Sequence, residues 1–215
     1  VANLHNNYNS TSTSAFTRGI AVTTSATTVT GNTVRNLTYG GLGTGAGISS
    51  GVTGIGVSAT TGVNTVSSNT VHTLKLTNAS ATTQKIEITG MFIGGGTFAN
   101  VVAKNTIHSL SLVANDTAAV ITGIDNGAGT VTFVNNMVRL GIDENGVPVT
   151  TGCMIRGITK GNSSSCNFWH NSVYIGGSGV TNSVATSIRH SFAFVRGTSG
   201  TADDIRNNIF SNQRS

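Results

Sequence analysis

The sequence predicts an all-β protein folded as a parallel β-helix, a solenoid of about six coils with three short strands in each coil. Two observations predict this fold class. Only 9% of the 215 residues are charged, 37% are hydrophobic, and the chain has 28 Gly and one Pro, so it can bury a core but is poor in helix-favouring residues. A repeat of about 35 residues also runs along the whole chain, which is typical of solenoids.

The repeat is marked by an Asn that follows one apolar residue by three positions and precedes another by two. Six such Asn lie 31 to 37 residues apart: Asn32, Asn69, Asn105, Asn136, Asn171 and Asn208. In a solenoid, residues at one phase of the repeat stack on one another. Asn tolerates the left-handed conformation of a sharp corner, and stacked amides can hydrogen-bond along the axis. We therefore expect these six residues to form a structural Asn ladder at a corner, rather than a ligand site.

Each repeat holds three short β-type runs. A Gly followed by an apolar residue precedes each of the first five Asn by 13 to 15 residues, beginning with Gly19. In the second repeat the expected strands are 54–58, 62–66 and 70–74, followed by a polar link over 78–83. Alternating apolar residues on runs this short favour strands over helices. Successive coils should then stack about 4.8 Å apart.

Three stretches of the repeat carry a resemblance to known proteins. They are Asn-Asn-Met-Val-Arg-Leu-Gly (135–141), Asn-Ser-Val-Tyr-Ile-Gly-Gly (171–177) and Ile-Arg-Asn-Asn-Ile-Phe-Ser-Asn (205–212). The overall pattern is similar to that of right-handed parallel β-helix proteins of the pectate-lyase-like superfamily, and these stretches resemble secreted, cell-surface β-helix repeat proteins of bacteria that use type IX secretion. The resemblance implies a right-handed solenoid at a secreted or cell-surface location. It implies no single activity, because that superfamily includes lyases, hydrolases, epimerases, adhesins and structural stalks.

The whole chain, 1–215, is expected to form one β-helix domain. Val1-Ala-Asn-Leu4 matches Val34-Arg-Asn-Leu37, so the chain begins inside a repeat. Neither end shows a capping segment, although an uncapped coil exposes unpaired backbone groups. We therefore expect either a fragment of a longer protein or a subunit that stacks end to end, with adjacent coils or other copies as partners.

Catalytic residues are not evident in the sequence. Polysaccharide lyases and hydrolases gather carboxylates at one place, whereas the acidic residues here occupy different phases of the repeat. Asp143 and Glu144 precede Asn-Gly and are expected to start a turn, and Asp203 and Asp204 are expected in a solvated loop. The sequence thus leans toward a protein without catalytic, cofactor or metal sites.

One column is a candidate binding surface. The residue after the second apolar position of the motif is Arg35, His72, His108, Arg139 and Tyr174 in successive coils, and we call these five residues the outer stripe. Stacked on a strand face, they could meet sugars, sulfated or uronic polymers, or a neighbouring filament; an ordinary polar face is the alternative. Trp169 could stack on a sugar ring or pack on its own loop. Metal binding by His72 and His108 is not expected, because no Cys or acid lies nearby in the repeat.

Two cysteines, Cys153 and Cys166, fall within one coil. In a secreted protein we expect them to form a disulfide that closes the intervening loop, whereas a cytosolic location would leave two thiols.

Charge and hydropathy exclude two classes of partner. The net charge is +5, but the basic residues are scattered singly, so nucleic-acid binding is not expected. No stretch is apolar enough for a membrane span. These features favour a non-catalytic extracellular segment that acts as scaffold, stalk, adhesin or filament subunit, with a carbohydrate-binding or polysaccharide-degrading module as the alternative.

Overall fold

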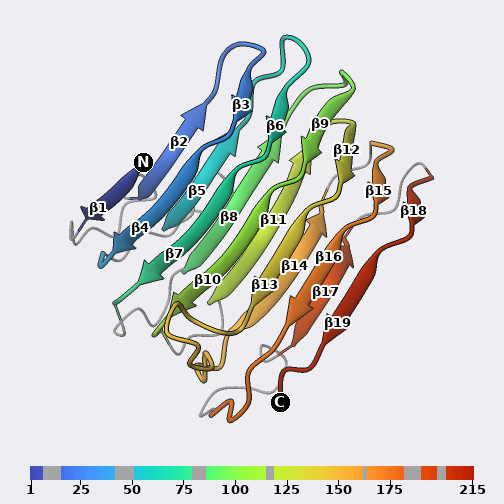
Figure 1. Cartoon of the computed structure of the whole chain (residues 1–215). Coiled ribbons are helices and arrows are strands. Elements are labelled where there is room, and N and C mark those ends of the chain that lie inside the picture. The colour runs from blue at the N-terminus through green and yellow to red at the C-terminus, as the bar shows by residue number, and fades with distance from the viewer. Residues whose placement is uncertain are drawn as a thin grey trace.

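The computed structural model describes residues 1–6, 16–41, 51–78, 86–114, 119–161, 164–181, 190–197 and 202–215. This described part is all-β and contains no helix, hence none long and apolar enough to cross a membrane. Its strands form three parallel sheets that wrap around one axis (Figure 1). The predicted fold class, a parallel β-solenoid, is therefore confirmed.

The three sheets are named here A, B and C. Sheet A comprises β1 (Ala2–Asn6), β4 (Thr33–Tyr39), β7 (Thr70–Leu76), β10 (Thr106–Leu112), β13 (Met137–Leu140), β16 (Ser172–Ile175) and β19 (Ile209–Asn212). Sheet B comprises β2 (Thr17–Val22), β5 (Val52–Val57), β8 (Glu87–Gly94), β11 (Val120–Ala128), β14 (Met154–Lys160) and β17 (Ser191–Arg196). Sheet C comprises β3 (Thr28–Thr30), β6 (Thr65–Ser67), β9 (Asn100–Ala103), β12 (Val131–Val134), β15 (Asn167–Trp169) and β18 (Asp204–Arg206).

The chain visits sheets B, C and A in turn, so every third strand joins the same sheet. About five turns separate β2 from β17, slightly fewer than the six coils expected. The first and last strands of the chain lie at opposite ends of the stack (Figure 1).

Strand bounds in the second repeat follow the expected pattern with one difference. β5 and β7 overlap the expected strands 54–58 and 70–74, whereas β6 spans 65–67 and so covers only the last two residues of the expected 62–66 run. The reason is Asn64, which is buried and hydrogen-bonds to Asn100 of the next coil at a corner. Beyond Asn78, the expected link lies outside the described residues.

The core consists of apolar rows that run along the axis. Val34, Val71, Ile107, Val138 and Val173 are in register on sheet A and at most 1% exposed. The glycines of the Gly-apolar element face this row from sheet B: a Cβ on Gly19, Gly54, Gly90, Gly123 or Gly157 would lie 2.3–2.6 Å from one of its side-chain carbons. The recurring Gly therefore allows sheets A and B to approach closely.

Candidate functional site

The six predicted Asn form one continuous ladder inside the solenoid. From Asn69 to Asn208, each Oδ1 accepts from the backbone N–H and from Nδ2 of the Asn one coil earlier, at 2.8–3.1 Å. The other Nδ2 hydrogen donates to a carbonyl of the preceding coil, as from Asn105 to Val66 at 2.9 Å. In the inner members of the ladder both donors and both acceptor positions of the amide are used. The structural Asn ladder is confirmed.

The left-handed corner conformation belongs to the residue before each Asn, which corrects the sequence-based expectation. These six residues have φ between 54° and 68°: Gly31, Ser68, Lys104, Asn135, His170 and Asn207. All six are exposed. The preceding residue turns the chain, and this turn directs the Asn side chain inward, where it reaches the next coil.

Five strands of sheet A bring the outer stripe together. Parallel register pairs Arg35 with His72, His72 with His108, His108 with Arg139, and Arg139 with Tyr174. All five side chains are exposed or half-buried. The predicted juxtaposition is present, and ligand binding by the stripe stays a prediction.

The two histidines of the outer stripe stack face to face. Their ring centroids are 4.9 Å apart and the rings are tilted by 5°. Each Nδ1 lies 2.9 Å from the hydroxyl of the following residue, Thr73 or Ser109. Burial lowers the pKa of His72, and Arg35 acts in the same direction; burial also lowers the pKa of His108, with further effects from His72 and Arg139. At neutral pH these rings are therefore uncharged, which permits close stacking between two arginines.

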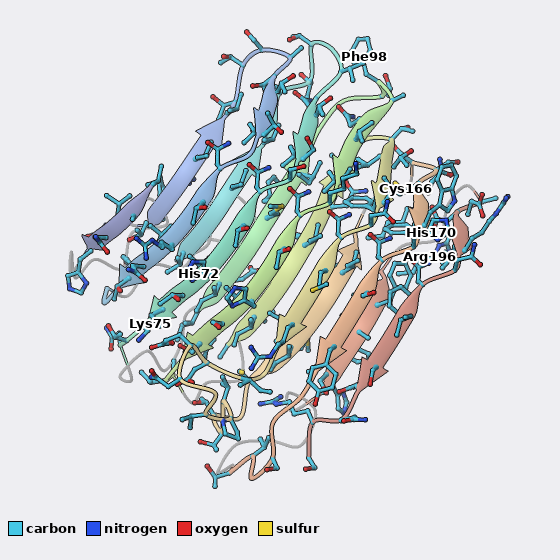
Figure 2. The ribbon with its side chains drawn as sticks, in the orientation of Figure 1. His72, Lys75, Phe98, Cys166, His170 and Arg196 are labelled. Carbon is cyan, nitrogen blue, oxygen red and sulfur yellow. The ribbon has the colours of Figure 1, made fainter. Side chains whose placement is uncertain are left out.

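Sheet A carries no acidic residue on any of its seven strands. It does carry basic residues: His5, Arg35, His72, Lys75, His108 and Arg139. His72 and Lys75 lie along β7 (Figure 2). Glu144, from the segment between β13 and β14, forms an ion pair with Lys75. The outer face of this sheet is therefore cationic.

A shallow groove adjoins the end of the stripe that carries Tyr174. It has a volume of about 440 Å³, and its lining includes Met137, Arg139, Ser172, Tyr174, Ile209 and Ser211. Met137 is 57% and Ile209 is 68% exposed, so the groove presents apolar side chains beside a guanidinium. We call it the Tyr174 groove.

Trp169 lies away from the stripe. It belongs to β15 of sheet C, in register with Val134 and Arg206. Its indole ring is half-buried, and its Nε1 atom is buried without a hydrogen-bond partner. The structure thus places Trp169 on a different face from the outer stripe, and sugar stacking by Trp169 stays untested.

A buried charged cluster was missed by the sequence analysis. Lys160 Nζ lies 3.3 Å from Asp203 Oδ1, with the two side chains 0% and 3% exposed, and Arg196 Nε lies 2.6 Å from Asp203 Oδ2. The backbone N–H of Cys166 also donates to Asp203 at 3.0 Å. Arg196, Cys166 and Lys160 together lower the pKa of Asp203 against the opposing effect of its burial. The expectation that Asp203 lies in a solvated loop is wrong, because this carboxylate is enclosed by cations.

A second, shorter Asn ladder was also missed. Asn64 donates its backbone N–H and its Nδ2 to Oδ1 of Asn100, both at 2.9 Å. Asn64, Asn100 and Asp203 each precede a motif Asn by five residues, and the bond from Cys166 to Asp203 repeats the bond from Asn64 to Asn100. That shared spacing was the available signal, but Thr27, Val131 and Cys166 interrupt the column.

The expected disulfide does not form, because Cys153 and Cys166 are both free and buried. Cys153 directly precedes β14, a seven-residue strand that spans about 20 Å. Cys166 lies beyond its far end, where Cys166 Sγ accepts from Asn126 Nδ2 at 3.1 Å and Asn126 is in register with Lys160. A strand length separates the thiols, far more than a disulfide can bridge. Figure 2 shows Cys166 near Arg196.

The acidic pair Asp143 and Glu144 lies at a turn. Asp143 Oδ1 accepts from the backbone N–H groups of Asn145 and Val147 at 2.9 and 2.8 Å, so the expected turn is confirmed. A cavity of about 350 Å³ lies between this turn and the ends of β7 and β10. Within the described ranges, no three His, Cys, Asp or Glu residues gather in a way that could hold a metal ion.

Comparison with known proteins gave no match among family models, curated proteins or solved structures. The class that the fold itself defines is the parallel β-solenoid.

Proposed function

We propose that this chain is a non-catalytic, extracellular β-solenoid segment that serves as a scaffold, stalk, adhesin or filament subunit. The observation that carries the proposal is the Asn ladder: the polar residue that recurs in every repeat hydrogen-bonds to its own counterparts along the axis. The recurring chemistry of the sequence therefore holds coils together rather than presenting reactive groups.

The acidic pair Asp203 and Asp204 supports a role without catalysis. Asp203 is engaged by Lys160 and Arg196, and Asp204 Oδ1 lies 2.5 Å from Arg206 Nε. A glycoside hydrolase needs two carboxyl groups facing one bond, one of them able to give a proton. An ionised Asp203 with a lowered pKa, enclosed by cations, is poorly suited to donate one.

The direction of the ladder supports end-to-end partners. One Nδ2 hydrogen of each Asn from Asn32 to Asn171 points to the next coil toward the C-terminal end of the stack, and each Oδ1 from Asn69 to Asn208 faces the N-terminal end. A further coil at either end, from this chain or from another copy, would therefore extend the ladder with matched donors and acceptors. A secreted or cell-surface location, and kinship with the pectate-lyase-like and type IX-secreted β-helix proteins, belong to the same proposal and are supported by the resemblance of the repeat.

An assay for polysaccharide cleavage tests the absence of catalysis. The purified chain is incubated with uronic and neutral polysaccharides, and we expect neither new reducing ends nor unsaturated products. Cleavage that is lost in Asp204→Asn, whose side chain lies at the surface, or in Asp203→Asn, would overturn the proposal.

A carbohydrate-binding module is the second candidate. It is favoured by the cationic outer stripe and the adjoining Tyr174 groove, since exposed aromatic rings beside hydrogen-bond donors suit sugar rings. A glycan-binding screen is the test, and the absence of binding to every acidic and neutral polymer would remove this candidate.

A further inference from the structure

We propose that the outer face of sheet A binds a linear anionic polysaccharide laid along the solenoid axis, and that acidification strengthens this binding by protonating two stacked histidines. The proposal rests on the carbohydrate-binding candidate and gives it a ligand class, a binding pose and a pH dependence. Acidic groups of the polymer lie against the outer stripe, and one sugar ring occupies the Tyr174 groove.

Charge complementarity points to an anionic ligand. The seven strands of sheet A contain Arg35, Lys75 and Arg139 and no Asp or Glu, so no carboxylate of these strands competes with a ligand. Lys75 is neutralised by Glu144. The two unopposed charges are therefore the arginines of the outer stripe, with the two histidines between them.

Spacing points to a polymer that runs along the axis. The histidine rings of adjacent coils are 4.9 Å apart, and parallel register continues this step from Arg35 to Tyr174. This step is close to the length of one monosaccharide in an extended chain. Successive acidic sugars can therefore meet successive coils, as a single small anion cannot.

The Tyr174 groove favours a polysaccharide over an inorganic or peptide polyanion. Its apolar side chains, Met137 and Ile209, flank a tyrosine ring that is 37% exposed. The C–H face of a sugar ring can pack on such a surface while Arg139, which also lines the groove, pairs with a carboxylate or sulfate. Carboxylated and sulfated polymers share this chemistry, and the experiment separates them.

The histidines provide the pH dependence. His72 faces Arg35 and His108, and His108 faces Arg139; Lys75 with its partner Glu144 lies further along β7. Burial and these neighbours hold the pKa of both rings below the ordinary value of 6.5. An anion on the stripe favours the charged form, so binding and protonation assist each other as the pH falls below 6.5. The Nδ1 contacts to Thr73 and Ser109 survive protonation, because a hydroxyl can accept as well as donate.

The experiment measures binding of dextran sulfate, a polyuronate and uncharged dextran by calorimetry at pH 7.5 and pH 5.0. We expect both charged polymers to bind about tenfold more tightly at pH 5.0, with binding weakened by added salt. The double variant His72→Gln/His108→Gln should lose most of this pH effect. His170→Gln, which alters an exposed histidine at a corner outside the stripe, should keep it.

Further variants distinguish the contribution of charge to binding from the contribution of the tyrosine ring. Arg139→Gln should weaken binding at both pH values, whereas Lys104→Gln, which removes an exposed corner cation, should not. Tyr174→Ala should weaken binding and Tyr174→Phe should retain it.

Equal affinity at the two pH values, or a pH effect that persists in the double variant, overturns the inference while leaving carbohydrate binding in place. Binding of uncharged dextran alone also overturns it, and no binding of any polymer removes the carbohydrate-binding candidate itself.

Discussion

Asn69 donates both its backbone N–H and its Nδ2 to a single atom, Oδ1 of Asn105, at 3.0 Å each. Both residues are at most 1% exposed. This shared acceptor joins backbone to side chain between two coils, and its repetition along the axis makes the coils interdependent.

Asn105→Ala should strongly destabilise the fold. It leaves the N–H of Asn69 and the carbonyl of Val66 buried without their partners, at about 1–3 kcal/mol each. We expect a loss of at least about 3 kcal/mol in the free energy of unfolding, measured by urea denaturation. Asn32→Ala, at a half-buried position on the outermost rung, is the control and should cost clearly less. Equal losses in the two variants would contradict the ladder's role.

Gly90→Ala should be poorly tolerated. Its new Cβ would lie 2.6 Å from both Gly123 O and Ile107 Cγ2, so the coils would have to separate. We expect a cost of about 2–4 kcal/mol. Gly161→Ala is the matched control, because its Cβ would be 3.6 Å from the nearest atom, Asn126 O. Thermal melting of both variants checks the prediction, which fails if Gly90→Ala melts with Gly161→Ala.

Asp203→Ala should destabilise the protein by about 3–5 kcal/mol, because it removes the carboxylate that pairs with both Lys160 and Arg196 in a buried cluster. Asp204→Ala removes an adjacent, more exposed carboxylate and should cost less than about 1 kcal/mol. The double variant Lys160→Met/Asp203→Leu should recover part of the loss. Denaturation curves that show no difference between Asp203→Ala and Asp204→Ala would argue against the buried ion pair.

Asp125 should make stability pH-dependent. Burial raises its pKa from 3.8 to about 6, although Arg156 acts in the opposite direction. The folded state therefore retains a proton that the unfolded state releases, so this group's contribution is fully present below pH 4 and is lost as the pH rises through 6. Asp125→Asn should be more stable than the wild type by about 1–3 kcal/mol at pH 7.5 and nearly equal at pH 4. A difference that is the same at both pH values would refute this assignment.

The thiols should be unreactive in the folded protein. Burial raises the pKa of Cys153 to about 11 and also raises the pKa of Cys166, so little thiolate exists at neutral pH. A thiol-specific reagent should modify neither residue in native buffer and both in denaturant. Reducing agent should leave the melting temperature unchanged. A mass two hydrogens below that of the dithiol chain would instead indicate the disulfide.

The solenoid could be predicted from the sequence because its most demanding contacts fall at the same position in every repeat. Each motif Asn must satisfy its neighbours above and below, so the same residue recurs six times and reveals both period and fold. The Gly before Ile55 recurs for a comparable reason, namely the close approach of sheets A and B. The outer stripe was predicted for the same reason, because residues at the same position of successive repeats lie side by side in a solenoid.

The other features depend on contacts that cannot be deduced from a residue's position within the repeat. Cys153 and Cys166 are close in sequence, but an entire strand separates them. Lys160 occupies an inward position where earlier coils have Val57, Ile93 and Asn126, and its pairing with Asp203 is visible only in three dimensions. The left-handed residue before each Asn was not predicted, because it is exposed and its identity differs between coils, so no single residue type recurs at that position.

That last feature gives the solenoid a set of exposed display sites that accept residues compatible with a left-handed backbone. One backbone geometry is shared by five residue types at these positions: Gly31, Ser68, Lys104, Asn135, His170 and Asn207. Chemical labels or short loops grafted there would project from the surface in a straight line with one attachment point per turn, and the internal amide network would be left untouched.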